Sequence, residues 1–481
     1  MITRFQIIYR YLGFIFLLNA LGMLLSAFVS IIYNDGSTYI LMYSAILAAL
    51  FGVFPLIFVP PAEDISNNEG LIIVVASWLI SCLIGAIPYV LWGVEFSFSN
   101  AWFESVSGFT TTGSTILVNI EAVPKGLLFW RAMTHWLGGM GIFVFALSVM
   151  PFMGEGMRVL YQSEMSALAL NNFQQRAKIA VNILASVYVG LTALETIALL
   201  FCGMDLFDAI THSFATIATG GFSPRNASVA YFNSISVEVV IMIFMIFSGI
   251  HFALLFGVIS GDFKSIWKSR IVRYYLLALF AGITISSIDL YITQYDSFAE
   301  ALRHASFQML SVGTSTGFAT ADSSIWSPVS QMLLIFFSLQ CACAGSTSGG
   351  IKADRIVILG KSIMRQIRQL QHPRAVLPLA IGDRVLEKDV AENAILYIVF
   401  YICIIFATTI LLVALGTDTT EAFTGTVATM GNVGPGLAGV GSVGNFNHIS
   451  DAGKWIFSVT MLLGRLEIYA LLMFFIPKHW K

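Results

Sequence analysis

Four short segments of this chain resemble one another: TTGST at 111–115, ATGGF at 218–222, STGFA at 315–319 and NVGPG at 432–436. We align them on Gly113, Gly220, Gly317 and Gly434, because glycine permits a backbone turn where a Cβ would clash. The residue before each glycine is β-branched and suited to extended backbone. Each segment also follows an apolar stretch, so the pattern predicts a structural unit that is repeated four times along the chain.

The composition is that of a membrane protein. Of the 481 residues, 57% are hydrophobic and only 11% are charged, whereas a soluble domain carries about 25% charged residues. The net charge of −2 argues against a basic nucleic-acid binder, and we expect no nucleic-acid partner. The cysteines all lie in apolar segments, without the spacing of a disulfide framework, and are expected to behave as small buried hydrophobes: Cys82, Cys202, Cys341, Cys343 and Cys403.

About 20 apolar residues cross a bilayer as a helix, and ten segments meet this criterion. They are 8–33, 39–60, 70–94, 124–152, 178–202, 229–259, 271–294, 326–350, 388–416 and 453–477. The stretches before the four glycines, 101–110, 205–217, 299–313 and 419–430, are too short or too polar to cross, and we interpret them as pore helices. Irregular backbone at membrane depth is tolerated only where it is buried in protein or lines water, so the four loops should meet at one aqueous axis.

The predicted fold class is an all-α polytopic membrane protein with ten transmembrane helices. Four pseudo-symmetric repeats of helix, re-entrant pore loop and helix surround one central pore, and an N-terminal helical hairpin precedes them. The expected boundaries are 1–69 for the hairpin and 70–155, 156–262, 263–375 and 376–481 for the repeats, the third of which has a broken second helix.

The basic residues predict the orientation in the membrane. Most Lys and Arg fall in the N-terminal tail, in 153–178, 260–273 and 352–388, and in the C-terminal tail, which are alternate connections. The positive-inside rule therefore predicts that both termini are cytoplasmic. The first apolar run lacks a short core with a small-residue cleavage site, so we expect an uncleaved helix and no removed signal peptide.

Longer motifs connect the chain to a known family. GFTTTGST at 108–115, THSFATIATGGFS at 211–223, STGFAT at 315–320 and TMGNVGPG at 429–436 resemble the four filter segments of the bacterial TrkH family, within the Trk, Ktr and HKT superfamily of potassium transporters. WRAMTHWLGGMGI at 130–142, GSTSGGIK at 345–352 and MLLGRLE at 461–467 extend the resemblance over nearly the whole chain.

The resemblance implies potassium uptake in the bacterial inner membrane by a homodimer with one pore per subunit. It implies K⁺ as the transported ion, with no bound organic cofactor. It also implies a partner, a cytoplasmic TrkA-like regulatory ring that binds NAD- or ATP-type nucleotides. The first loop alone follows TTGS and the fourth alone has NVGP, so the expected filter is less symmetric than that of a tetrameric channel.

Potassium must shed water to enter a narrow filter, and backbone carbonyl oxygens can replace its hydration shell. No carboxylate falls inside the four segments, which argues against a calcium or magnesium site. In this family, serine in place of the first-loop glycine tends toward sodium. The residues expected to supply the ion-binding carbonyls are Thr111, Thr112, Gly113, Ala218, Thr219, Gly220, Ser315, Thr316, Gly317, Asn432, Val433 and Gly434.

Two further features are candidates for gating. Arg465 lies about 12 residues into the last apolar segment, roughly 18 Å along a helix, and we expect it to face the pore below the filter as an electrostatic barrier. The alternative is a structural anchor to another helix. The run AGSTSGG at 344–350 should break span eight and form a loop that closes the inner mouth, the alternative being a membrane-edge linker. The expected gating residues of this loop are Gly345, Ser346, Thr347, Ser348, Gly349 and Gly350.

Several charged residues have two open interpretations. An acidic residue opens or precedes each pore helix, and these residues form either a solvated rim or a vestibule that concentrates cations. They are Glu104, Asp205, Asp208, Glu300, Asp418 and Glu421. The basic run from Lys361 to Arg374 binds either the regulator or anionic lipid. We expect His135, His212 and His304 to serve packing or hydrogen bonding and not proton transport.

Two rival functions remain within transport, a sodium-permeable relative and a proton-coupled potassium symporter. A membrane enzyme is disfavoured because the sequence has no HExxH motif, nucleophile elbow or metal-spaced Cys and His cluster. GPGLAG at 434–439 matches GxGxxG, but that fingerprint requires a strand before it and a helix after it, and here a pore helix is expected before it. Nucleotide control must therefore come from another chain.

Overall fold

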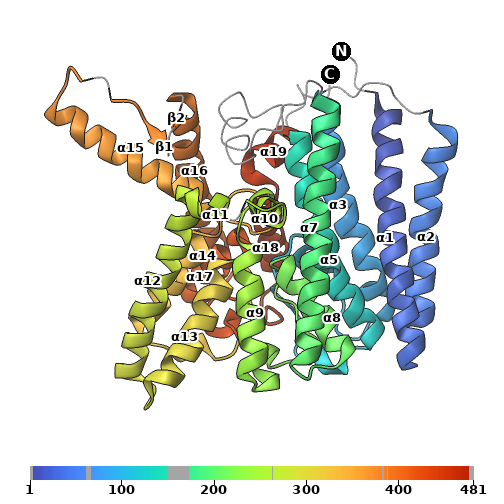
Figure 1. Cartoon of the computed structure of the whole chain (residues 1–481). Coiled ribbons are helices and arrows are strands. Elements are labelled where there is room, and N and C mark those ends of the chain that lie inside the picture. The colour runs from blue at the N-terminus through green and yellow to red at the C-terminus, as the bar shows by residue number, and fades with distance from the viewer. Residues whose placement is uncertain are drawn as a thin grey trace.

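The computed structural model describes residues 4–60, 67–149, 173–262, 264–375, 377–381, 384–386 and 388–475. The regular secondary structure of the described residues is helical apart from a hairpin of two short strands, β1 (Ala380–Ile381) and β2 (Arg384–Val385). Long helices stand side by side in one bundle, and the start of α1 and the end of α19 lie at the same end of it (Figure 1). The long helices are α1 (Phe5–Tyr33), α2 (Thr38–Phe58), α3 (Asn67–Trp92), α5 (Lys125–Val149), α7 (Phe173–Phe201), α12 (Arg270–Thr293) and α16 (Lys388–Ala414).

Among the described residues, six helices are long and apolar enough to cross a membrane, and the number rises to eight if each of two bent helix pairs counts as one span. The chain is therefore a multi-pass membrane protein. The count of ten spans stays a prediction. The expected spans at 124–152 and 326–350 correspond to α5 and to α14 (Pro328–Leu339), which are not among the six, and α14 has only 12 residues.

Three expected spans are broken helices. The span at 229–259 consists of a 3₁₀ turn (Ser228–Phe232), α9 (Ile235–Ser248) and α10 (Phe252–Ile259), and the two helices meet at 105°. The last span is α18 (Asp451–Arg465) followed at 114° by α19 (Glu467–Phe474). In span eight, α14 ends at Leu339 and α15 (Ala353–Gln371) begins 14 residues later, so the break starts before the predicted 344. Figure 1 shows α15 projecting sideways from the bundle.

Four short helices lie among the long ones at the predicted pore-helix positions: α4 (Phe98–Phe109), α8 (Leu206–Ile217), α13 (Phe298–Gly313) and α17 (Thr419–Gly431). Three of them begin with a side-chain cap. Ser97, Asp205 and Asp418 accept backbone N–H groups of the first turn, which satisfies donors that the helix itself leaves unpaired. The remaining short elements are α11 (Lys264–Lys268) and 3₁₀ turns at Ile120–Ala122, Ser323–Ile325 and Ala438–Val440.

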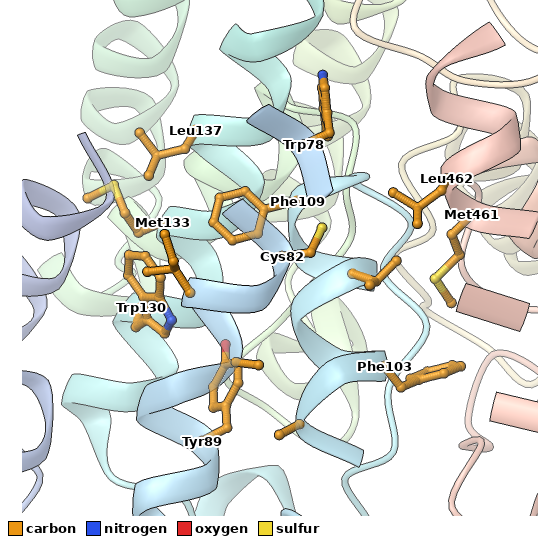
Figure 2. Packing of buried hydrophobic residues seen from close by; sticks show 14 of the residues in the cluster. Trp78, Cys82, Tyr89, Phe103, Phe109, Trp130, Met133, Leu137, Met461 and Leu462 are labelled. Carbon is orange, nitrogen blue, oxygen red and sulfur yellow. The ribbon is translucent and has the colours of Figure 1, made fainter. Parts of the chain in front are cut away.

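The short helices are held in place by packing of large side chains. Around α4, Phe103 and Phe109 lie in a buried cluster with Trp78 and Trp130 (Figure 2). The Trp130 indole donates to the Gly85 carbonyl at 3.1 Å, so its polar atom is paired although the ring is buried. Close packing of this kind fixes where α4 ends, and hence where the following loop begins.

Of the basic segments that predicted the orientation, 153–172 and the C-terminal tail lie outside the described residues.

Candidate functional site

The four short helices end with the same backbone geometry. A residue in the left-handed region follows each helix, and a glycine at positive φ lies two positions later. The left-handed residues are Thr111, Thr219, Ser315 and Asn432, with φ of 52°, 54°, 59° and 51°, and the glycines are Gly113, Gly221, Gly317 and Gly434, with φ of 85°, 78°, 84° and 100°. The residue between donates its N–H to the carbonyl five residues earlier in every loop, at 2.7–2.9 Å.

This geometry corrects the alignment of the second loop by one residue. Gly221, and not Gly220, corresponds to Gly113, Gly317 and Gly434. Ala218 then corresponds to Thr110 and lies before the left-handed residue, while Gly221 was missed as a candidate. The tandem glycines at 220 and 221 were the available signal, but only the backbone angles decide between them.

The four loops form a closed ring. A Cβ built on Gly113 would lie 2.0 Å from the Gly220 carbonyl oxygen, and one on Gly221 would lie 2.1 Å from that of Thr316. A Cβ on Gly317 would lie 2.1 Å from the Val433 oxygen, and one on Gly434 would lie 2.7 Å from that of Thr112. The series visits every loop once and returns to the first. Glycine is therefore required at each position because a side chain would collide with a carbonyl of the next loop.

Side-chain hydrogen bonds connect the first loop to the fourth loop, which are neighbours in the ring although they are far apart in the sequence. Ser114 Oγ donates to the Gly434 carbonyl at 2.8 Å. The Asn432 side-chain amide donates to Thr112 Oγ1 and to the Met461 carbonyl, both at 2.9 Å. Asn432 thus links the fourth loop to the first loop and to α18.

The segment that follows each loop is hydrogen-bonded to its own short helix through side chains, and the residues that make these bonds differ from loop to loop. In the first loop Ile116 N donates to Glu104 at 3.0 Å, and in the second His212 Nε2 lies 3.0 Å from Ser223 Oγ. In the third loop Gln308 donates to the Ala321 carbonyl at 3.0 Å, and in the fourth Leu437 N donates to Thr424 at 3.0 Å. These bonds fix the segment after each loop against the short helix that precedes the loop.

All four positive-φ glycines line one cavity of about 130 Å³. The described residues around it include Arg131 and Arg225 and no carboxylate. The cavity is therefore not the acidic vestibule that the sequence allowed.

The acidic residues divide into two groups. Glu104 is fully buried and pairs with Arg131 at 2.6 Å, and Asp208 pairs with Arg225 at 2.6 Å. The interpretation as a solvated rim is wrong for these two, because each carboxylate is buried and paired with an arginine. The others lie at the outer helix starts: Asp205, Glu300 and Asp418 are exposed, and Glu421 accepts from His448 at 2.9 Å.

The loop of residues 340–352 lies against the ends of three of the four short helices. Thr347 Oγ1 donates to the Ile217 carbonyl at 2.9 Å, and Gly349 N donates to Ser315 Oγ at 3.2 Å. A Cβ on Gly349 would lie 2.5 Å from the Asn432 side-chain oxygen. The loop is closed at its base, where Cys341 N donates to the Ile351 carbonyl at 3.0 Å. It is buried next to the ring, which argues against a linker at the membrane edge.

Arg465 connects this loop to α5. Its side chain is 1% exposed, and it donates to the Thr347 carbonyl at 2.5 Å and to the Gly138 carbonyl of α5 at 3.1 Å. Arg465 therefore makes the contacts of the alternative interpretation, a structural anchor, one to α5 and one to the candidate gating loop. Arg465 ends α18 and is not inside a continuous helix, and Glu467 pairs with Arg355 at 2.8 Å.

The three histidines make packing and hydrogen-bonding contacts, as expected. His135 Nδ1 lies 2.7 Å from the Gly108 carbonyl, its Nε2 accepts from Phe222 N at 3.2 Å, and its ring stacks on Phe222. His135 thereby joins the first short helix to the second loop. His212 bonds as described above, and His304 stacks on Tyr295.

The chain is similar to known proteins along its whole length. Residues 42–481 match the family model TrkH, described as "Cation transport protein". Similar proteins include the Trk system potassium uptake protein TrkH of Escherichia coli K12, 35% identical over 99% of this chain and 100% of that protein. TrkG of the same organism is 30% identical over 100% of this chain and 99% of that protein.

A solved structure shares the fold. The crystal structure of the potassium transporter TrkH from Vibrio parahaemolyticus has a TM-score of 0.91 at 32% identity and covers 100% of both chains. These matches confirm the resemblance and place the chain among transport proteins and not enzymes. Together with the four loops that close into one ring, they show that this chain belongs to the TrkH family of cation transport proteins.

Proposed function

We propose that this chain takes up potassium ions through a pore whose selectivity filter is the ring of four loops. The observation that carries the proposal is the cyclic approach of Thr112, Gly220, Thr316 and Val433 carbonyls to the four glycines. Carbonyl oxygens arranged around one axis can replace the hydration shell of a potassium ion. Proteins similar to this chain along its whole length are named for potassium uptake or as a potassium transporter, which favours K⁺ as the transported ion.

The proposed filter follows the corrected register. Its carbonyls come from Thr111, Thr112, Gly113, Thr219, Gly220, Gly221, Ser315, Thr316, Gly317, Asn432, Val433 and Gly434. Ala218 is left out because its place in the second loop corresponds to Thr110. The architecture proposed around this filter is ten spans in four repeats with the boundaries given above, after an N-terminal hairpin.

The loop of residues 340–352 is proposed as the gate of this pore. Its segment Gly345–Gly350 lies against three of the four helices that lead into the ring, and Arg465 fixes it in that position. A cation that leaves the ring on this side meets the loop and the guanidinium of Arg465. Release of the Thr347 carbonyl by Arg465 would free the loop.

The partners are proposed from the family. The chain acts as a homodimer in the bacterial inner membrane with both termini in the cytoplasm, and a TrkA-like ring that binds NAD- or ATP-type nucleotides controls the gate. Helix α15 projects sideways from the bundle in Figure 1. Its basic residues contact either the TrkA-like regulator or anionic lipid. The alternatives within transport are a sodium-permeable pore and proton coupling.

Flux in liposomes tests the proposal. The purified chain is reconstituted with and without its regulator, and uptake of rubidium is measured against competing potassium or sodium. We expect potassium to compete and sodium to compete poorly. Equal competition by sodium would favour the sodium-permeable alternative, and uptake driven by a proton gradient alone would favour symport. No rubidium uptake in any regulatory condition would refute conduction.

A further inference from the structure

Another cavity lies between α1, α3 and α5, with Phe109 of α4 in its lining. Its volume is about 430 Å³, within the range of roughly 300–1,000 Å³ that ligand pockets occupy. Its walls are mostly aliphatic and aromatic side chains, among them Leu18, Val74, Trp78, Phe109 and Leu137. Figure 2 shows three of these, Trp78, Phe109 and Leu137, within the packing around α4.

The cavity is elongated along the helices. On α1 its lining runs from Tyr11 to Asn19, and on α3 it runs from Gly70 to Ser81. At 1.5 Å per residue, the α3 stretch is about 16 Å long. Both helices qualify as membrane spans, so the cavity extends from one end of a span to about half of a bilayer core of roughly 30 Å.

Water is a poor occupant for this space. A buried water needs two to four polar partners, and apolar cavities stay dry. Two polar side chains in the lining donate to carbonyls of their own helices, Ser77 to Ile73 at 2.5 Å and Asn19 to Ile15 at 2.9 Å. Among the described lining residues only Asn19 Oδ1 is buried without a hydrogen-bond partner, and one acceptor is too few to hold a water. The occupant should therefore be a hydrocarbon.

One side of the cavity is bounded by residues that face outward from the bundle. Phe14 and Leu18 of α1 are 51% and 43% exposed, and in a membrane protein such apolar side chains contact lipid tails. We propose that this cavity is a lipid site that holds one acyl chain of a membrane phospholipid, inserted between α1, α3 and α5. Three observations favour this occupant: the elongated shape, the dry walls, and the opening toward the lipid phase.

The inner wall of the lipid site is shared with the gating region. Trp78 lines the cavity, and its ring centroid lies 5.7 Å from the Arg465 guanidinium carbon. Gly138 also lines the cavity, and its carbonyl accepts from Arg465 at 3.1 Å. An acyl chain in the lipid site is thus separated from Arg465 by a single layer of protein.

Quenching of Trp78 fluorescence by brominated lipid tests the site without any measurement of ion flux. The full chain is placed in liposomes of phosphatidylcholine that carries bromine in mid-chain, and the Trp78 signal is obtained by subtracting the Trp78→Phe variant. We expect bromolipid to remove most of the Trp78 signal and acrylamide in the water phase to leave it. A Trp78 signal that bromolipid leaves unchanged, or that acrylamide quenches, would overturn the proposal.

A matched pair of glycine variants controls for the route of quenching. A Cβ at Gly70, in the cavity lining, meets no atom within 4 Å, so Gly70→Phe should fill the site and restore the Trp78 signal in bromolipid. Gly190 on α7 is equally open and lies outside the lining, so Gly190→Phe should leave quenching intact. Quenching that persists in a normally folded Gly70→Phe protein would show that bromine reaches Trp78 by another path and would refute the site. Thermal unfolding checks the folding of all three variants.

Discussion

Glu104 and Arg131 form an ion pair of 2.6 Å that connects two loops of the ring. Glu104 accepts from Thr115 and Ile116 of the first loop, and Arg131 donates to the Ser223 carbonyl of the second loop at 3.0 Å. Both side chains are almost fully buried. A buried pair of this kind gives geometry more than stability, since the loss of hydration offsets much of the attraction. Here the ion pair fixes the position of the first loop relative to the second.

Removing one charge of this pair should destabilise the protein strongly. Glu104→Gln leaves Arg131 buried without its carboxylate, which typically costs about 3–5 kcal/mol. Thermal unfolding in detergent measures the loss, and rubidium uptake should fall with it. Glu300→Gln is the matched control, because Glu300 is exposed and such changes usually stay within about 0.5 kcal/mol. Equal melting temperatures for Glu104→Gln and the unaltered protein would contradict this account of the pair.

The corrected register of the second loop predicts a specific effect at Gly221. Gly221→Ala places a Cβ at positive φ and 2.1 Å from the Thr316 carbonyl oxygen, so the ring must distort. We expect loss of potassium preference over sodium, measured by competition against rubidium uptake. Gly190→Ala adds the same methyl group where nothing lies within 4 Å, and it should keep both flux and selectivity. A selective Gly221→Ala pore would show that this residue does not face its neighbour as described.

Asn432 should control the contact between the first and fourth loops. Asn432→Gly retains the left-handed backbone but removes the bonds to Thr112 and Met461. A net contribution of about 0.5–1.5 kcal/mol per hydrogen bond predicts a modest loss of stability. Selectivity should decline more clearly than the melting temperature, because the bonds position the filter. Unchanged competition by sodium would argue against a role of Asn432 in selectivity.

The Arg465 contacts predict a release of the gate. Arg465→Ala removes both bonds, to Thr347 and to Gly138, and should raise rubidium uptake in the absence of the regulator. Arg465→Lys keeps the charge but cannot donate in the same forked geometry, so it separates the anchor from the electrostatic barrier. If the anchor dominates, both variants leak; if the barrier dominates, only Arg465→Ala does. Normal resting flux in a well-folded Arg465→Ala protein would remove Arg465 from gating.

Deleting Gly345–Gly350 tests the loop itself. The deletion removes the contacts with Ile217 and Ser315 and should raise resting uptake, because the obstacle next to the ring is lost. Deletions often impair folding, so Thr347→Val provides a milder comparison: it loses only the hydroxyl donor and should raise uptake less. Resting uptake equal to that of the unaltered protein, in a deletion variant with a normal melting temperature, would count against a gate.

The sequence by itself determined the class of the protein and the places where its structure is irregular. Apolar runs of sufficient length fix where helices can cross a membrane, and the glycine-containing segments fix where those runs must turn. A break in span eight and the special position of Arg465 followed from local chemistry, because a run of glycines and hydroxyl residues weakens a helix and an arginine inside an apolar run is costly in lipid.

Only the tertiary structure decided the register of the second loop, the partners of the buried charges and the closure of the ring. Gly220 and Gly221 are equivalent as sequence, and the choice between them depends on the backbone angle set by the loop that lies beside them. Glu104 and His212 are hydrogen-bonded to the segments that follow their loops through different chemical groups. No residue type shared by the loops therefore marked the residues that hold these segments in place. The contacts between neighbouring loops join residues roughly a hundred or more positions apart, and their energies depend on packing that local sequence does not contain.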